Sequence, residues 1–564
     1  MAVVEQTDVL IVGAGPVGLA LAIELGRRGL RCLVVEKNDR VGLNPRAKTT
    51  NARTREHLRR WGIAENLRKA SALPADYPSD IIFTTRLSGP QLTKIDNAFN
   101  CSPEKNDLYS ESGQWVPQFV LEEVLRAYAV TLPGVQVRFN TDYLSAVQDA
   151  QGVTATVRGA ADGREYQVHG QYMVGADGSH SVVRETVGAT MKGTRNIAQN
   201  FNVQFRAPAL TKLHKHGRAI MYWQINSEVP SVLGPMGDVW YFIATRVDSK
   251  IEGTEEELKA LIQRSTGFEF ELEILGSSPW AAHSLIADKY SSGRIYLAGD
   301  ACHLHPPFGG YGMNMGIADG VDLGWKLAAM LQGWGGEGLL ESYEVERRPV
   351  HEWIIEEAIA NYNALGNHLQ LPGLEAPGES GEATRREAGD VIFAAKQREF
   401  RTLGAVLGYC YENSPVIVRD GSAAPPANSS IYRPSAHPGC LAPHLWLSDG
   451  TSLYDHFGEG FTLLVTVAGD NTDTSQAEDL ARTMQVPLKV LRPEESRLRP
   501  RYGASFALIR PDQHVVWRGE SVADLGPVLK KVTGFSQIPR HGSPSFQRQR
   551  GVGAVRCEGK DSCS

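Results

Sequence analysis

Short runs of consecutive apolar residues predict the central strands of this chain. Such runs occupy residues 8–12 (DVLIV), 32–35 (CLVV), 172–174 (YMV) and 294–298 (RIYLA). A strand that is apolar at nearly every position is covered on both faces, as in a parallel sheet flanked by helices. Helical periodicity follows over residues 19–28 and from about Met313 onward. The pattern therefore predicts an α/β fold built on a buried parallel sheet.

A different pattern, in which apolar and polar residues alternate, takes over between residues 190 and 285. Aromatic and β-branched side chains alternate with polar ones in 200–206, 219–225 and 239–246, which is typical of an antiparallel sheet. Residues 75–110 lack strong periodicity, so we assign them to the same second domain. The aromatic residues of this domain could line an apolar pocket, although such residues more often form plain core.

The C-terminal part, from about Ile431, has its own order of elements. Strand-like patterns cover 462–467, 486–491, 506–510 and 515–517, and a helical pattern covers 477–483. This β-α-β then β-β order suggests a thioredoxin-like unit. Because the chain contains no CxxC sequence, a dithiol redox role is excluded for it.

These patterns divide the chain into a discontinuous first domain, an inserted domain and C-terminal parts. We assign residues 1–75, 111–188 and 286–365 to the parallel-sheet domain, 76–110 and 189–285 to the inserted antiparallel-sheet domain, 366–430 to a helical linker, 431–540 to the thioredoxin-like domain and 541–564 to a polar, disordered tail. Within the linker, 366–392 reads as an exposed connection and 391–411 as a helix.

Composition narrows the class of protein further. The 564 residues are 42% hydrophobic and 22% charged, as in ordinary globular proteins, and the net charge of −6 disfavours a nucleic-acid partner. Seven scattered cysteines argue against a disulfide scaffold and for a reducing compartment. The chain has no run of about 18 apolar residues, so we expect no transmembrane helix and a cytoplasmic location.

The first glycine-rich turn carries the strongest local signal. Gly13-Ala14-Gly15-Pro16-Val17-Gly18 lies between a predicted strand and a helix, and Glu36 ends the next predicted strand, 18 residues after Gly18. In such a GxGxxG turn the glycines permit a tight turn, close approach to a pyrophosphate and close helix packing, and the carboxylate suits a ribose hydroxyl. We therefore predict dinucleotide binding. A second GxGxxG at 333–338 follows a helix, so we interpret it as a loop.

Two further carboxylates follow predicted strands. Asp177 and Asp300 are candidate binding residues, because open α/β sheets bind ligands at the carboxyl ends of their strands. For Asp177, a tight Asp-Gly turn explains the sequence equally well. Residues 306–312 (PPFGGYG) form a stiff turn and a glycine run that opens a helix. The N–H groups at such a helix start suit an anion or a developing negative charge.

Two other groups of residues allow more than one interpretation. Arg46 precedes a helix expected at about 51–61, where it could meet a pyrophosphate or be an ordinary surface arginine. Cys302, His303 and His305 are metal-ligand types, but three such residues so close in sequence rarely converge on one ion, and spacing supplies no fourth ligand. We therefore expect no metal site.

Three motifs, taken together, resemble those of the single-component FAD-dependent aromatic hydroxylases (group A flavoprotein monooxygenases). They are GAGPVG with Glu36, GADGSHSVVR at 175–184, and GDACHLHPPFGGYGMNMGIADGVDLGWKLA at 299–328. The chain is most similar to the branch with a C-terminal thioredoxin-like domain, which includes phenol and aromatic polyketide hydroxylases. The resemblance covers roughly 6–535 and implies an FAD-binding Rossmann-like domain with an inserted substrate-binding domain.

The resemblance also implies a set of cofactor-binding residues. Gly13, Gly15 and Gly18 would hold the FAD pyrophosphate, Glu36 the adenosine ribose, and Asp300 the ribityl chain; Arg46 and Gln118 match positions that contact FAD; Asp177 would serve structure, FAD and NAD(P)H; Pro306 would lie beside the isoalloxazine, and Gly312, Met313 and Asn314 would face its pyrimidine edge. Tyr311 replaces the usual Gln and Met315 a frequent Thr, so we expect altered flavin geometry or pocket shape rather than different chemistry.

The reaction implied is hydroxylation of a phenolic or polycyclic aromatic substrate by O₂ and NADPH or NADH, through a flavin hydroperoxide. His283, Tyr222 and Tyr311 are candidate partners of the phenol, and nothing in their spacing selects one. A Baeyer–Villiger or epoxidising monooxygenase on the same fold is the alternative, and a non-catalytic flavin-binding sensor is a further one. The expected partners are the small aromatic substrate and O₂, with a homodimer left open.

Overall fold

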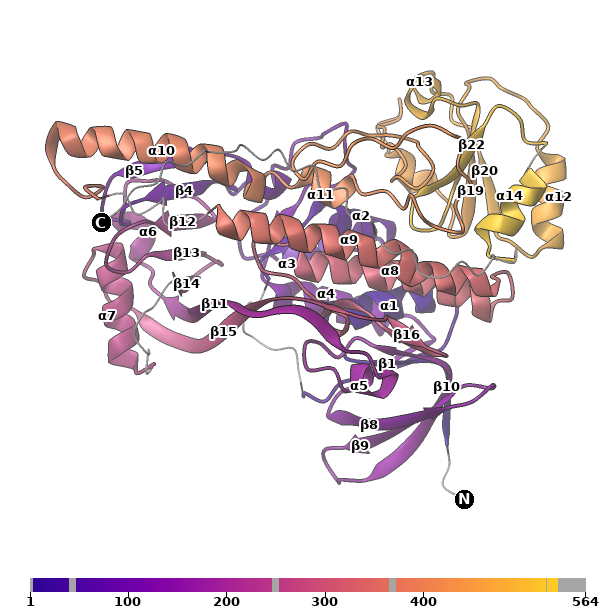
Figure 1. Cartoon of the computed structure of the whole chain (residues 1–564), viewed down its shortest axis with the longest axis horizontal. Coiled ribbons are helices and arrows are strands. Elements are labelled where there is room, and N and C mark those ends of the chain that lie inside the picture. The colour runs from indigo at the N-terminus through magenta and orange to yellow at the C-terminus, as the bar shows by residue number, and fades with distance from the viewer. Residues whose placement is uncertain (1–3, 40–46, 246–252, 365–371, 524, 536–564) are drawn as a thin grey trace, which may run out of the picture.

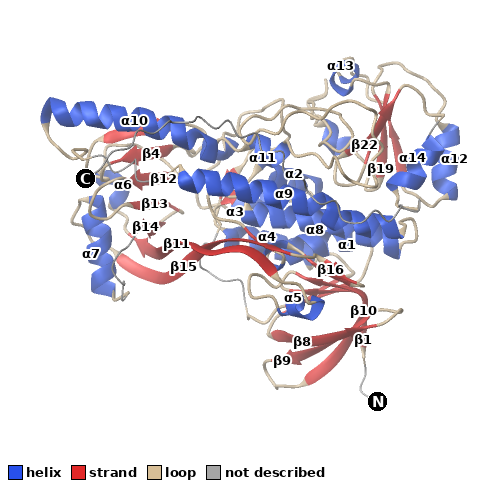
Figure 2. Cartoon of the chain, viewed as in Figure 1, coloured by secondary structure: helices blue, strands red, loops and turns tan. Residues whose placement is uncertain are grey.

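The computed structural model describes residues 4–39, 47–245, 253–364, 372–523 and 525–535. The described residues form two eight-stranded sheets, one four-stranded sheet, one two-stranded sheet and the helices that pack on them (Figures 1 and 2). Arg46 and the tail expected at 541–564 lie outside the described residues. Among the residues that the structure describes, no helix is long and apolar enough to span a membrane.

The first sheet is the parallel sheet that the apolar runs predict. Its main strands lie in the order β16-β17-β10-β1-β2-β7, with β17, β10, β1, β2 and β7 parallel to one another. The bounds are β1 Glu5–Val12, β2 Cys32–Val35, β7 Val135–Arg138, β10 Glu165–Gly175, β16 Ser291–Ser292 and β17 Ile295–Leu297, and an antiparallel extension consists of β8 Thr141–Gln148 and β9 Val153–Gly159.

Helices cover this sheet, and the two most central ones are in close contact through glycine. They are α1 (Pro16–Arg27) and α8 (Gly312–Leu331). A Cβ atom on Gly320 would lie 2.9 Å from the Val17 carbonyl oxygen, and one on Gly324 would lie 2.6 Å from the Cβ of Glu24. Only glycine at these positions lets the two helix backbones come so close. The other helices of this region are α2 Ala52–Arg60, α3 Ala64–Ala70, α4 Gln118–Ala129, α5 Val182–Val187 and α9 Glu337–Asn363.

The second sheet combines strands from both inserted segments. Its order is β18-β15-β11-β14-β13-β12-β4-β5, and all its neighbours are antiparallel except β12 and β4. The bounds are β4 Ile81–Thr84, β5 Gln91–Ile95, β11 Met191–Arg206, β12 Met221–Gln224, β13 Ser231–Pro235, β14 Val239–Thr245, β15 Glu273–Ala287 and β18 His303–Leu304. One face packs against α6 (Leu210–Leu213) and α7 (Glu255–Thr266), and the other packs against Trp115 and α10 (Gly378–Phe400).

The start of α10 corrects the expectation for the linker. Residues 366–392 were expected to be an exposed connection, but α10 already begins at Gly378. Ala388 and Ile392 of α10 are buried against Ile81 and Ile95 of the second sheet, so this tertiary contact stabilises a helix in a polar sequence. A short helix, α11 (Leu403–Leu407), follows it. The second GxGxxG sequence forms the turn between α8 and α9, as predicted.

The C-terminal unit has the expected order of elements. Its sheet runs β20-β19-β21-β22, in which β19 and β20 are parallel and β21 and β22 are antiparallel additions. The bounds are β19 Phe461–Val465, β20 Leu488–Leu491, β21 Phe506–Ile509, β22 Val515–Gly519, α12 Ser475–Thr483, α13 Leu498–Tyr502 and α14 Leu525–Val532. The unit packs at one end of α8 and α9, on the side away from the second sheet (Figure 1).

A buried network of charges fixes the C-terminal unit to the first domain. Arg510 donates to both carboxylate oxygens of Glu346 at 2.8 and 2.9 Å and to Asp322 at 3.2 Å. Lys326 donates to Asp322 at 2.8 Å and to Glu346 at 2.7 Å. Burial alone would raise the pKa of Glu346, but Arg510 and Lys326 lower it to about 2. Glu346 therefore stays ionised only while these cations remain in place, whereas burial raises the pKa of Asp322 to about 6.

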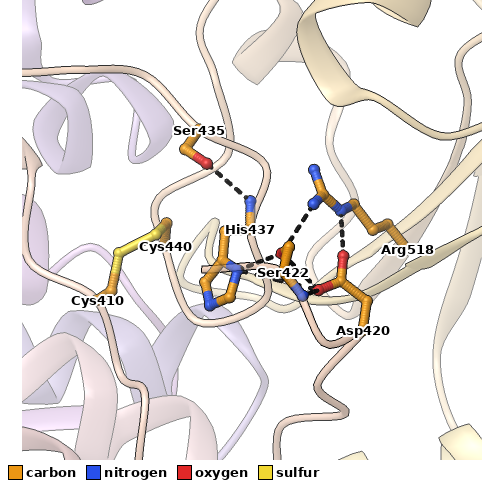
Figure 3. Close-up of a disulfide and its surroundings, with 7 residues drawn as sticks. All are labelled: Cys410, Asp420, Ser422, Ser435, His437, Cys440 and Arg518. Atoms are coloured by element: carbon orange, nitrogen blue, oxygen red, sulfur yellow. Dashed lines mark hydrogen bonds and ion pairs between the residues drawn. A yellow bond between two sulfur atoms is a disulfide. The ribbon is translucent and has the colours of Figure 1, made fainter. Parts of the chain in front are cut away.

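A disulfide joins the linker to the C-terminal unit. The scattered cysteines of the sequence had argued against a disulfide scaffold. Cys410 and Cys440 are bonded, beside a network in which Arg518 of β22 donates to Asp420 and Ser422 (Figure 3). The two cysteines lie 30 residues apart, a spacing that carries no motif, so only the tertiary fold reveals the pair. Since disulfides persist mainly in oxidising compartments, the cysteine pattern no longer supports a reducing one.

We expect Arg510→Met to lower the free energy of unfolding by about 3–5 kcal/mol, because it leaves Glu346 and Asp322 with fewer buried cations. Urea denaturation monitored by tryptophan fluorescence measures the change. The control is Arg206→Met, which breaks exposed ion pairs and should change stability by less than about 0.5 kcal/mol.

Equal effects of the two substitutions would contradict a structural role for the buried network. A truncated chain of residues 1–425 tests the same idea, because it removes Arg510 together with the whole C-terminal unit. If that chain keeps its fold, its assembly and its rate of turnover, the C-terminal unit is dispensable and our interpretation is wrong.

Candidate active site

Four neighbouring strands of the first sheet end at the same edge. Their order is β17-β10-β1-β2, and they are parallel, so the loops that follow them lie side by side. These loops contain the glycine turn after β1, Glu36 after β2, Asp177 after β10 and Asp300 after β17. The structure therefore brings together residues that are up to 287 positions apart in the sequence (300 − 13).

The three glycine positions of the first turn differ in why they require glycine. A Cβ on Gly13 would lie 2.3 Å from the Ala176 carbonyl oxygen, and one on Gly18 would lie 2.0 Å from the Gly13 carbonyl oxygen. The fold itself therefore requires glycine at both positions. A Cβ on Gly15 would have no described protein atom within 4 Å, although Gly15 is the N-cap of α1. The open space at Gly15 lies where a helix N-terminus favours a phosphate.

Glu36 is held by backbone groups of this turn. Its Oε2 atom accepts from the Ala14 N–H at 2.9 Å, and its Oε1 atom accepts from the Asn38 backbone N–H at 3.0 Å and from the Asn38 side chain at 2.6 Å. The carboxylate is half-buried next to the turn. Its orientation is thereby fixed at the end of β2, beside the N-terminus of α1.

Asp177 and Asp300 differ in their surroundings. Asp177 accepts from the hydroxyl of Ser181, the N-cap of α5, at 2.5 Å and from the first-turn N–H of Val183 at 3.1 Å. Burial raises the pKa of Asp177 above its ordinary value, although these hydrogen bonds oppose the rise. These contacts hold Asp177 within its own turn, and its role toward FAD and NAD(P)H stays a prediction. Asp300, in contrast, is exposed in the short turn after β17.

The N-terminus of α8 is tied to the segment that follows Arg46. The Asn314 side chain accepts from the Asn51 N–H at 2.9 Å and from the Thr54 hydroxyl at 2.8 Å, and it donates to the carbonyls of Thr49 at 2.8 Å and Gly310 at 2.9 Å. Its side chain is thus fully used within the protein. The backbone N–H groups of the first turn, at Gly312 and Met313, have no carbonyl of their own helix to bond.

A contact with the second sheet lies next to this helix end. Thr49 and Thr50 form β3, which pairs with β6 (Gln114–Trp115), and the Lys48 ammonium lies 4.4 Å from the ring centre of Tyr241 in β14. Burial lowers the pKa of Lys48 to about 8. The sequence alone assigns Lys48 no role, because a lysine two residues after Arg46 and shortly before a predicted helix resembles an ordinary surface cation.

Two more residues of the predicted cofactor site are Gln118, which contacts the chain at Ala47, and Pro306, which precedes α8. The backbone N–H of Gln118 donates to the Ala47 carbonyl at 2.9 Å, and its side chain accepts from the Ala47 N–H at 3.4 Å and donates to Glu122 at 2.7 Å. Gln118 therefore positions the chain directly after Arg46. Pro306 is buried in the turn that leads to α8.

The three candidate partners of a phenol do not lie together. Tyr222 belongs to the face of the second sheet that α6 and α7 cover, where its hydroxyl donates to the Gly217 carbonyl at 2.6 Å. Tyr311 is fully buried in a cluster with residues of α9 and the C-terminal unit. His283 lies on β15 and accepts from the Asn196 N–H at 3.1 Å. The sequence did not reveal which face Tyr222 would occupy, because alternate residues of a strand face opposite sides of the sheet.

His303 and His305, which the sequence already singled out, form a buried cluster with His351 around Asp319 that the sequence did not reveal. Asp319 accepts from His303 at 2.7 Å, from His351 at 2.8 Å and from Arg347 at 2.8 Å, and His305 lies 3.3 Å from His351. His303, His305 and His351 are close enough to share a metal ion, so the absence of a metal stays a prediction. A signal was present: Asp319 lies among apolar residues and glycines in a largely apolar helix, where a carboxylate needs buried partners.

The described residues fit a dinucleotide such as FAD. The open position at Gly15 suits a pyrophosphate, Glu36 lies at the distance along the chain expected for a ribose contact, and the N-terminus of α8 offers donors to a negatively charged ring. Since these features lie along one edge of the first sheet, an extended cofactor can contact all of them.

Comparison with known proteins identifies the family. Residues 6–358 match the family model "FAD binding domain", and residues 435–535 match "Aromatic-ring hydroxylase, C-terminal". The chain belongs to this family of FAD-binding aromatic-ring hydroxylases. It is an FAD-dependent monooxygenase of aromatic substrates, as the resemblance of its three motifs implied.

Relatives span nearly the whole chain. Phenol 2-monooxygenase from Pseudomonas sp. is 30% identical, covering 95% of this chain and 94% of the relative. The structure of the rebeccamycin biosynthetic enzyme RebC with reduced flavin matches with a TM-score of 0.87 at 33% identity, covering 95% of this chain and 100% of that one. A ternary complex of aklavinone-11 hydroxylase with FAD and aklavinone matches with a TM-score of 0.80 at 29% identity, covering 94% and 100%.

We expect Gly15→Ala to abolish most FAD binding without loss of stability, because its Cβ meets no described protein atom but lies where the pyrophosphate approaches. FAD retained after purification and the midpoint of urea denaturation of the apoprotein measure the two effects. Gly276→Ala is the matched control, since its Cβ also has open space but lies on β15. Full FAD occupancy in Gly15→Ala would show that the cofactor does not approach this turn.

Proposed function

We propose that this protein hydroxylates a phenol, of one ring or several, with NADPH or NADH and O₂. The observation that carries the proposal is that the N-terminus of α8 and an aromatic face of the second sheet both contact the strand pair β3 and β6. On one side lies the N-terminus of α8, tied to Thr49 by Asn314. On the other lies an aromatic face of the second sheet, where Tyr241 packs against Trp115 and Trp115 stacks on Phe99.

This aromatic face supports an aromatic guest. The ring centres of Trp115 and Tyr241 lie 6.2 Å apart, and those of Phe83 and Trp223 lie 5.8 Å apart on the same face. Aromatic rings favour offset or edge contacts with other rings at such distances. The relatives agree in kind, since one is named for phenol and another is seen with aklavinone.

We assign FAD to the edge of the first sheet, with Gly13, Gly15, Gly18 and Glu36 at the adenosine and pyrophosphate end. Arg46, Gln118, Asp177, Asp300, Pro306, Gly312, Met313 and Asn314 complete the proposed set. When bound, FAD supplies the hydride acceptor and the activation of O₂ that no side chain can provide. The first-turn N–H groups of α8 would stabilise negative charge at the flavin, and the second sheet would exclude water from the ring.

NAD(P)H would bind transiently, because the described residues form one GxGxxG turn of the strand–helix type and no second one. We place the protein in the cytoplasm, where metabolism supplies this co-substrate, and we leave open a homodimer. The disulfide between Cys410 and Cys440 is compatible with that location, because Cys440 is buried and Cys410 half-buried, which limits the access of reductants.

We expect Asp300→Ala to yield largely apoprotein, with FAD bound at least about tenfold more weakly, because a carboxylate that accepts ribityl hydroxyls contributes a charged hydrogen bond. Flavin absorbance per protein and fluorescence titration of apoprotein measure the loss. Asp238→Ala, which removes an exposed carboxylate of the second domain, should retain full occupancy. Full occupancy in Asp300→Ala as well would count against the assignment of Asp300.

The function itself is tested by NAD(P)H oxidation in air, with a panel running from simple phenols to polycyclic polyketides. We expect one compound to accelerate oxidation strongly and to give a product heavier by one oxygen with its ring intact. A ring-opened or lactone product would establish the Baeyer–Villiger alternative. No acceleration by any compound, despite reducible bound FAD, would contradict a phenolic substrate.

A further inference from the structure

The histidine cluster around Asp319 contains two buried nitrogens, Nδ1 of His303 and Nδ1 of His305, that have no hydrogen-bond partner among the described residues. Asp319, His303 and His351 are fully buried, and the Nδ1 atom of His305 is buried as well. No hydrogen-bond partner of this atom occurs among the residues that the structure describes. A Cβ on Gly312, the first residue of α8, would lie 3.9 Å from it. The unpartnered nitrogen of His305 is therefore beside the helix end to which we assign the flavin.

The hydrogen bonds determine which nitrogen of His351 carries its proton. Burial alone would raise the pKa of Asp319, but His351, Arg347 and His303 hold it well below the ordinary value. Asp319 is therefore a carboxylate with no proton to donate, and the Nε2 atom of His351, at 2.8 Å, must be the donor. Burial lowers the pKa of His351 to about 3, so this imidazole is neutral and its Nδ1 atom is a lone-pair acceptor.

The same reasoning extends to His305. Its Nε2 atom lies 3.3 Å from the Nδ1 acceptor of His351, so His305 must donate from Nε2. Burial lowers the pKa of His305 well below its ordinary value, and the nearby His303, His351 and Arg347 disfavour a second proton further. The neutral ring then has its lone pair on Nδ1, the nitrogen that lies beside Gly312.

We propose that His305 is a ligand-binding residue of the active site, whose Nδ1 atom accepts a hydrogen bond from an O–H or N–H group of the molecule at the N-terminus of α8. Asp319 and His351 are positioning residues that act through His305 by fixing its tautomer. The proposal rests on the function assigned above. The donor belongs either to the phenolic substrate or to FAD, and the test separates these two sources.

An aligned acceptor of this kind suits the site for a physical reason. The first-turn N–H groups of α8 and the Lys48 side chain, close to the same helix end, can only donate. A bound molecule with an acidic O–H or N–H needs an acceptor as well, and a neutral imidazole provides one without placing a negative charge beside an anionic ring. A carboxylate at the position of His305 would repel that ring.

The test compares two substitutions in the FAD-loaded enzyme. His305→Asn keeps a polar atom near the position of Nδ1, whereas His305→Gln places its polar atoms near Nε2, toward His351. We expect His305→Gln to weaken binding of one molecule about threefold to tenfold and His305→Asn to stay within about twofold, because one neutral hydrogen bond is at stake. His456→Gln, in the C-terminal unit, is the matched control and should change neither affinity.

Two affinities identify the donor. One is the Kd of FAD, from titration of the apoprotein. The other is the Kd of the panel phenol with the largest stimulation, beside that of its O-methyl ether, from the absorbance change of bound flavin. A loss confined to FAD assigns the donor to the cofactor. A loss confined to the phenol, with the ether unaffected, assigns it to the substrate hydroxyl.

A third measurement does not depend on the proposed function. In the wild-type enzyme labelled with ¹⁵N-histidine, the signals missing from His305→Gln should show a protonated Nε2 and an unprotonated Nδ1. A proton on Nδ1, unchanged affinities in His305→Gln, or a stoichiometric metal ion that is lost in that variant would each overturn the proposal. Failure of the whole phenol panel would instead contradict the assigned function and leave the tautomer result valid.

Discussion

Helix α8 buries two carboxylates, and much of the structure serves to bring cations to them. Asp319 and Asp322 of α8 lie in the interior, where an ionised group without partners would cost several kcal/mol. Arg347 of α9 pairs with Asp319, and Arg510 of the C-terminal unit pairs with Asp322. The docking of α9 and of the C-terminal unit around α8 therefore stabilises this helix in its place.

The same helix connects these contacts to the cofactor edge. Glycines on one side of α8 let it approach α1, the helix that begins at the pyrophosphate turn. Its N-terminus is tied by Asn314 to the strand pair β3 and β6, and its first residue lies beside His305. A single rigid element thus relates the glycine turn, the proposed flavin ring and the histidine cluster, so a shift of α8 would disturb all three together.

Most of the fold was accessible from the sequence because its signals are local. The GxGxxG turn, the all-apolar strands and the order of the thioredoxin-like elements each depend on residues close along the chain. The missed features depend on distant partners. The charge network joins Asp322 to Arg510, the disulfide joins Cys410 to Cys440, and α10 is stabilised by β4 and β5. Hydrophobic periodicity does not show which distant residues pair. It also does not show which face of β12 Tyr222 occupies.

The order of strands in the first sheet has a consequence for synthesis of the chain. β17 pairs with β10, but residues 176–294, including most of the second sheet, are translated between them. At typical translation rates of about 5–20 residues per second, one edge of β10 waits roughly 6–24 s for its neighbour. α8 comes later still, and its Asp322 must wait for Arg510, almost 190 residues further along. The cofactor edge therefore starts to form at the glycine turn and is complete only once Asn314 has been translated, 301 residues after Gly13 (314 − 13).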